Sequence, residues 1–85
     1  MGYSVYILKS KKVEKFYIGY SSNPSRRLEF HNSVEKGFTL RYRPWELVYQ
    51  KEYELKTEAL SAERKIKSWK SKEMIKKLIN QEIEI

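Results

Sequence analysis

Two runs rich in aromatic and β-branched residues stand close together near the start of the chain. They are YSVYILKS at residues 3–10 and KFYIGY at residues 15–20, separated by a short polar segment. Such runs favour β-strands, so a hairpin is predicted with strands at 3–9 and 15–20. Bulky side chains occur at both odd and even positions. The sheet is therefore expected to be covered on at least part of both faces.

A helix and a third strand are predicted next. Asn23 followed by Pro24 is typical of a helix start, since Asn accepts a bond from a free amide and proline at the first position loses no needed donor. The helix is expected over 24–33. After a polar loop that contains Gly37, PWELVYQKEY predicts a strand at about 45–53.

The rest of the chain reads as helical. KTEALSAERKIKSW predicts a helix over 57–69 and SKEMIKKLINQ another, each with apolar residues on one face. The tail at 80–85 is expected to be frayed. The predicted fold class is α/β of the α+β kind: a small, mainly antiparallel three-stranded sheet flanked by helices in the order ββαβαα.

The chain of 85 residues predicts one domain over 1–85, with a core at about 3–79. It contains no cysteine, which excludes disulfides, cysteine zinc sites and a thiol nucleophile. The N-terminus lacks the pattern of a secretory leader, and no run of about 18 apolar residues occurs. The expected location is cytoplasmic, with no membrane contact.

The charge balance points to a partner. The chain has eighteen Lys and Arg residues and eleven Asp and Glu residues, which give a net charge of +7. A positive field on a small chain makes nucleic acid the leading candidate. The alternative is that the lysines only solvate exposed helices, and charge alone does not decide between the two.

The first predicted helix carries two candidate site residues. Arg27 and His31 are four positions apart and so share one face, and Leu28 beside them can anchor the helix to the sheet. Each also has a simpler interpretation taken singly. Arg27 fits an exposed arginine, and His31 fits a histidine bonded to a backbone carbonyl.

Glu63 is out of place on the second predicted helix, because it falls within an apolar stripe. That stripe is formed by Ala59, Ala62, Ile66 and Trp69. An ionised carboxylate there costs several kcal/mol unless it is paired or binds a cation. An ion pair with Lys67 or with an arginine across the sheet explains it as well as a magnesium site does. Mg²⁺ often takes only one or two protein oxygens together with substrate phosphate.

Tyr6 and Tyr17 lie in the two strands of the predicted hairpin. A strand tyrosine is most simply a packing residue. A tyrosine is a poor general base at neutral pH, because only about one phenol in a thousand is ionised there. A neighbouring cation, a metal or a second base would have to assist it, and Arg27 and His31 are candidates.

Together these segments resemble the GIY-YIG nuclease superfamily. The matching segments are VYI at 5–7, YIG at 17–19, NPSRRLEFHN at 23–32 and ALSAERKIKSW at 59–69. The resemblance covers about 3–79. It is closest to the short stand-alone bacterial GIY-YIG proteins and more distant to the N-terminal domain of the excinuclease subunit UvrC and to Slx-type nucleases. Ser4 replaces the glycine of the first half-motif, and Asn80 is the one candidate for an asparagine that some members carry.

The resemblance implies a role for each motif residue. Tyr6 and Tyr17 match the tyrosines of the two half-motifs, and Gly19 would let the strand turn close to the substrate backbone. Arg27, and not its neighbour Arg26, matches the arginine that stabilises charge on the scissile phosphate. His31 falls where the family holds His or Tyr.

The resemblance also implies a metal, since Glu63 matches the carboxylate that holds Mg²⁺ or Mn²⁺. The expected activity is a metal-dependent endonuclease that hydrolyses DNA phosphodiester bonds, with a role in repair or recombination. Water would be deprotonated by Tyr6 with help from His31, and Tyr17 would orient water or phosphate. Branched, nicked or single-stranded DNA are the expected substrates.

Two alternatives remain from other functional classes. One is a non-catalytic nucleic-acid-binding module with the same fold, against which the presence of all five key positions counts. The other is an accessory subunit whose partner supplies specificity. A homodimer would also enlarge the small binding surface of one domain.

Overall fold

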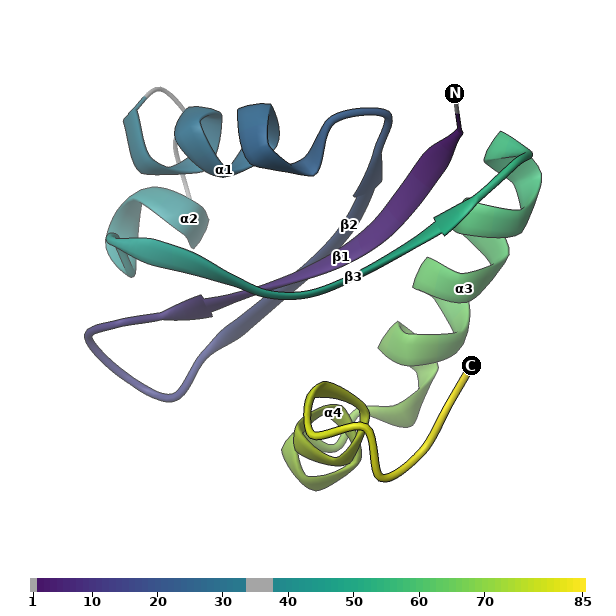
Figure 1. Cartoon of the computed structure of the whole chain (residues 1–85). Coiled ribbons are helices and arrows are strands. Elements are labelled where there is room, and N and C mark those ends of the chain that lie inside the picture. The colour runs from purple at the N-terminus through teal and green to yellow at the C-terminus, as the bar shows by residue number, and fades with distance from the viewer. Residues whose placement is uncertain (1, 34–37) are drawn as a thin grey trace.

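The computed structural model describes residues 2–33 and 38–85, so Gly37 of the predicted loop lies outside the described residues. The elements agree closely with those predicted (Figure 1). In chain order they are β1 (Tyr3–Ser10), β2 (Phe16–Ser21), α1 (Pro24–Ser33), α2 (Phe38–Arg41), β3 (Trp45–Tyr53), α3 (Lys56–Trp69) and α4 (Lys72–Ile79).

The three strands form one antiparallel sheet in the order β2-β1-β3. The hairpin strand β1 is therefore central, and β2 lies at an edge. In this register Tyr6 of β1 lies opposite Gly19 of β2 on one side and Gln50 of β3 on the other. The β1–β3 register shifts between Ile7 and Leu8, which marks a bulge.

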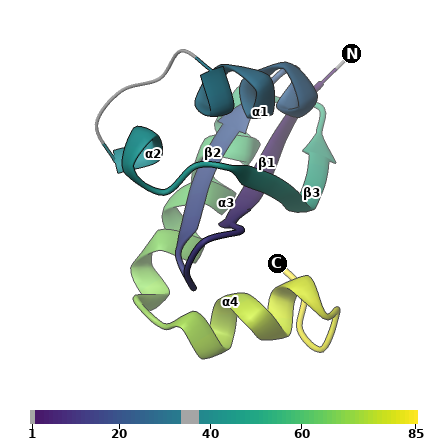
Figure 2. The ribbon, with the colours of Figure 1, turned by 90° about the vertical axis from the view of Figure 1, so that its left-hand side faces the viewer.

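Helices cover both faces of the sheet, as the two-sided pattern of the strands predicted. In Figures 1 and 2, α1 and α2 lie on one side of the strands, and α3 and α4 lie on the other. Alternate residues of β1 supply both cores. Val5 and Ile7 pack with α3 and α4, whereas Tyr6 and Leu8 pack with Trp45 and with Leu28 of α1.

The helix starts follow capping rules. The Asn23 side chain accepts a hydrogen bond from the Arg26 amide at 3.2 Å, which confirms the predicted start of α1. Ser71 accepts one from the Met74 amide at 3.3 Å at the start of α4. At α3 the Glu58 carboxylate accepts from the Leu55 amide, so this helix begins one residue before the prediction.

The prediction of a frayed tail is wrong. Ile83 and Ile85 pack against the apolar cluster beneath α3 and α4, and the Lys51 ammonium donates to the Ile85 carbonyl at 2.6 Å. The alternation of Glu and Ile in the tail places both isoleucines where they cover apolar surface. The short helix α2 was not predicted, because four residues are too few to show a helical period.

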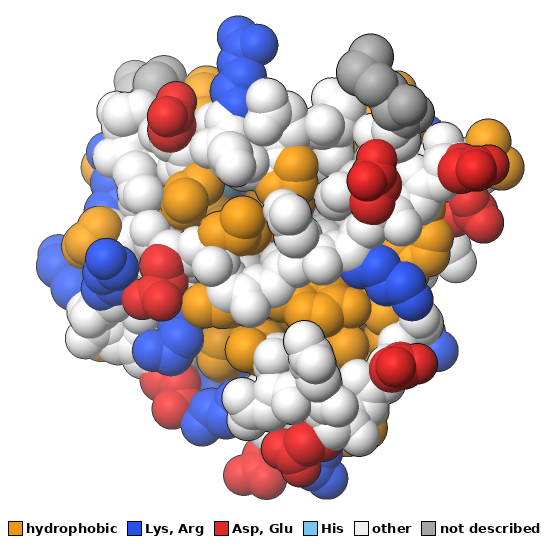
Figure 3. Space-filling view, viewed as in Figure 1, with side chains coloured by type: hydrophobic (Ala, Val, Ile, Leu, Met, Phe, Trp, Pro, Cys, Tyr) orange, Lys and Arg blue, Asp and Glu red, His pale blue; other side chains and the backbone are white. Residues whose placement is uncertain are grey.

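Charged side chains surround apolar ones on the face shown in Figure 3. Across residues 2–33 and 38–85, no helix has the length and apolar character needed to cross a membrane.

Candidate active site

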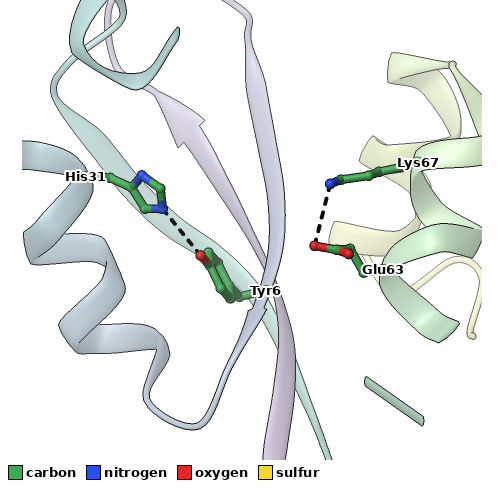
Figure 4. Close-up of polar contacts among 4 residues, drawn as sticks. All are labelled: Tyr6, His31, Glu63 and Lys67. Carbon is green, nitrogen blue, oxygen red and sulfur yellow. Dashed lines mark hydrogen bonds and ion pairs between the residues drawn. The ribbon is translucent and has the colours of Figure 1, made fainter. Parts of the chain in front are cut away.

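Tyr6 is at the centre of the candidate site. Its side chain points from the central strand β1 toward α1, and only 1% of the residue is exposed. The phenol oxygen lies 3.3 Å from Nε2 of His31, which is itself buried on α1 (Figure 4). One of the two groups donates and the other accepts, as the histidine tautomer dictates. The two candidates therefore form a buried polar pair.

Tyr17 completes this aromatic cluster. Its ring centroid lies 4.4 Å from that of His31 and 6.4 Å from that of Tyr6. Tyr17 reaches the cluster from the edge strand β2, and its ring also meets Trp45 edge-on. The sheet register and the last turn of α1, which carries His31, thus bring together side chains from three elements.

Arg27 lies beside the same cluster. Its guanidinium carbon is 4.7 Å from the ring centroid of Phe30, and its side chain acts to lower the pKa of the Tyr6 phenol, against the larger effect of burial. The side chain is half-buried and not simply solvated. A cation is therefore held next to a buried phenol, where an anion bound at the site would also meet it.

Burial raises the pKa of the Tyr6 phenol above its ordinary value of 10.0. Interaction with the Arg27 side chain opposes this shift, and the negative charge of Glu63 adds slightly to it. The phenol consequently keeps its proton near neutral pH in the free protein.

Gly19 has a different role from the expected one. It does not turn the chain, because it lies inside β2 directly opposite Tyr6. A Cβ at this position would lie 2.7 Å from the Tyr6 hydroxyl and 3.2 Å from the ring of Tyr17. Glycine is therefore required here because the two tyrosine rings occupy the space of a side chain.

Two further interactions, which the sequence did not predict, hold α1 against β3 and against the segment that precedes this strand. The Asn32 side chain accepts from the Trp45 amide at 2.6 Å and donates to the Trp45 carbonyl at 3.0 Å. Arg43 donates to the His31 carbonyl at 2.7 Å. These contacts hold the chain at His31 and Asn32, at the end of α1. Asn32 follows His31 directly, but its partner is far away in the sequence, so no local pattern could identify it.

Glu63 lies on α3, and in Figure 4 the strands pass between it and the Tyr6–His31 pair. Its side chain is 13% exposed and forms an ion pair with Lys67 at 3.5 Å, whereas Lys67 is 55% exposed. The ion pair is one of the alternatives that the sequence left open. The α3 helix contacts both β1 and β2, which places Glu63 near the tyrosine cluster without direct contact to it.

The donors present fit only a metal that needs few protein ligands. Among the described residues, no group of three or more His, Cys, Asp and Glu side chains could hold a metal ion. Glu63 offers a single, partly buried carboxylate whose partner Lys67 is exposed. Such a donor suits Mg²⁺ or Mn²⁺, which accept one carboxylate together with water and phosphate oxygens, and does not suit a structural zinc site.

Comparison with known proteins agrees with this arrangement. The family model described as the GIY-YIG catalytic domain matches residues 2–78. A UPF0213 protein of Staphylococcus aureus is 41% identical over 66 residues, which cover 76% of this chain and 79% of that protein. The solution NMR structure of a UPF0213 protein from Bacillus halodurans matches with a TM-score of 0.59 and 28% sequence identity. The match covers 95% of this chain and 85% of the Bacillus chain.

More local similarity links the chain to fungal proteins. A protein of Pyrenophora tritici-repentis named structure-specific endonuclease subunit slx1 is 46% identical over 50 residues. The match covers 53% of this chain but only 14% of the fungal protein. The match to the family model, by contrast, spans nearly the whole chain and includes every residue of the candidate site. The chain therefore belongs to the GIY-YIG family.

Proposed function

We propose that this protein is a metal-dependent endonuclease that hydrolyses phosphodiester bonds of DNA. The observation that carries the proposal is the cluster of a buried phenol, a histidine and a guanidinium beside the edge strand β2, with Glu63 on the helix that contacts the same strand. The printed names of the fungal relatives support nuclease chemistry. The net charge of +7 suits a polyanionic substrate.

The cation and the carboxylate would act on the scissile phosphate from two sides. Arg27 would stabilise the negative charge that develops on the phosphate oxygens. Glu63 would hold Mg²⁺ or Mn²⁺, and such an ion, when bound, stabilises the charge of the leaving oxygen. Lys67 would then exchange its carboxylate partner for a substrate phosphate.

Tyr6 would take the proton of the attacking water and pass its own proton to Nε2 of His31. This order is suggested by the raised pKa of Tyr6. A phenol that is still protonated can pass its own proton to His31 as it accepts one from water, but it cannot act as a phenolate base. The water oxygen bonds to phosphorus as the phosphorus–oxygen bond to the leaving group breaks. Tyr17, in ring contact with His31, would keep the imidazole in place.

The relay predicts a shallow pH profile. Between about pH 8 and about pH 9, the single-turnover cleavage rate is expected to change less than about threefold, because Tyr6 stays protonated before the step. A phenolate base would instead give an increase of about tenfold per pH unit, since the pKa lies above this range. Such an increase in the wild type, absent from Tyr6→Phe, would contradict the relay.

A cleavage panel tests the proposed activity itself. Labelled duplex, nicked, branched and single-stranded DNA would be incubated with the full chain, with and without Mg²⁺ or Mn²⁺. Cleavage of at least one structure, only with metal, is expected. If none is cut with either ion, the alternatives of a binding module or of an accessory subunit replace the proposal. The word subunit in the name of the fungal relative favours the second.

A further inference from the structure

A groove lies between β2 and the junction of α3 with α4, on the face of the sheet that carries Glu63. Its volume is about 350 Å³. Apolar side chains and lysines share its lining, together with Ser71. The apolar members are Phe16, Ile18, Ile66 and Ile75, and the basic members are Lys15, Lys67, Lys70 and Lys72.

The groove is positively charged. Lys67, Lys70 and Lys72 are exposed at its margin, and no acidic residue lines it. Glu63 pairs with Lys67, whereas Glu14 pairs with Lys76 at 2.9 Å and feels the charge of Lys72. Among the described residues, no ion pair within 4.0 Å involves the exposed groove lysines Lys70 and Lys72.

Lys70 has an unusual backbone. It ends α3 in the left-handed conformation, with φ of 50°, where glycine is the common residue because it carries no Cβ. A lysine at this position costs about 1 kcal/mol relative to glycine. This end of α3 places the cationic side chain of Lys70 at the groove margin.

The groove adjoins the candidate active site. Lys67 belongs to both, since it lines the groove and pairs with Glu63 at 3.5 Å. Strand β2 also belongs to both, because Tyr17 points to the tyrosine cluster while its neighbours Phe16 and Ile18 form the groove floor. A DNA strand bound at Glu63 could therefore continue along the groove.

We propose that this groove binds unpaired nucleotides of the DNA strand next to the cleaved bond, with a base on Phe16 and the flanking phosphates on Lys70 and Lys72. An aromatic floor with cations at its margin is the arrangement that holds single strands. A base within a duplex cannot turn its face onto Phe16, so the groove selects a strand that is not paired there. This inference rests on the proposed nuclease function, because Glu63 defines where the strand begins.

Binding without metal tests the groove separately from cleavage. Fluorescence anisotropy of the full chain in a chelator would compare a duplex that ends in a single-stranded arm with a blunt duplex of equal length. Tighter binding of the armed duplex is expected. In the double variant Lys70→Ala with Lys72→Ala, the affinity for the armed DNA is expected to fall about tenfold. The slope of log affinity against log salt should shrink by about 1.4, which is about 0.7 for each phosphate that a lysine no longer neutralises.

Matched controls separate the groove from general charge. Lys65 of α3 and Lys77 of α4 are exposed and do not line the groove, so Lys65→Ala with Lys77→Ala removes the same charge from the same helices. Phe16→Leu keeps the floor apolar and is expected to weaken binding of the arm by about fivefold through loss of stacking. Thermal unfolding would show that each variant is folded.

The outcomes distinguish the two proposals. Equal losses in the two double variants, or equal affinity of the wild type for blunt and armed duplexes, would overturn the groove and leave the nuclease proposal standing. Groove-dependent binding by a wild type that cuts no DNA with Mg²⁺ or Mn²⁺ would overturn the nuclease proposal and keep the groove as a binding site.

Discussion

Replacement of Arg27 by alanine is expected to lower the rate of metal-dependent DNA cleavage by about a hundredfold to a thousandfold, the effect of removing one group that stabilises transition-state charge. Arg27 is the cation that lies against Tyr6, so its loss leaves the phosphate charge without a protein partner on this side of the site. Single-turnover rates at saturating protein measure the effect without a contribution from DNA affinity.

Arg26 provides the matched control. It precedes Arg27 on α1 but is exposed and carries the same charge. Arg26→Ala is expected to change the single-turnover rate less than about threefold, since a solvated charge contributes mainly to affinity. Equal losses of cleavage rate in the two variants would show that both arginines act through nonspecific electrostatic attraction of DNA and not in the chemical step.

Gly19→Ala is expected to produce the second large effect. The new Cβ would lie 2.7 Å from the Tyr6 hydroxyl and 2.9 Å from its ring carbon, so the buried phenol must move. Overpacking of this kind lowers the free energy of unfolding by about 1–3 kcal/mol. Because the phenol also leaves its position beside His31, the cleavage rate should fall by about a hundredfold in a protein that is still folded.

A double-mutant cycle checks the cause. Tyr6→Phe removes the oxygen that the Cβ would meet most closely, so Gly19→Ala should cost less unfolding free energy in the phenylalanine background than in the wild type. Denaturant unfolding of the four proteins measures this difference. An equal cost in both backgrounds would show that the substitution acts on the strand and not through the phenol.

Much of the fold was predictable because its signals are local. The capping pair Asn23 and Pro24 sets the start of α1, and the β-branched and aromatic runs set the hairpin strands. Bulky residues at both odd and even positions of β1 correctly indicated two cores, one on each face. The tail was mispredicted because the surface that Ile83 and Ile85 cover is assembled from distant segments.

The candidate site was predictable in its members but not in its geometry. The spacing of Arg27 and His31 places both on one face of α1, whereas the register that puts Gly19 opposite Tyr6 depends on strand pairing. The Asn32–Trp45 bonds and the Lys67 partner of Glu63 are likewise properties of the folded chain. Sequence reasoning gave Gly19 the wrong role, because a glycine inside a strand can serve a turn or a close neighbour equally well.

The most direct test of the nuclease proposal is the cleavage of its preferred DNA structure by Glu63→Gln with increasing Mg²⁺. The wild type is expected to cut only with metal, and Glu63→Gln to retain less than about one hundredth of that rate, because the amide is a poor ligand for a hard cation. Glu46→Gln is the control, since Glu46 is exposed on β3 at the opposite edge of the sheet, and it should keep the wild-type rate. Cleavage by folded Glu63→Gln at the wild-type rate, or equal cleavage by the wild type in a chelator, would contradict the account.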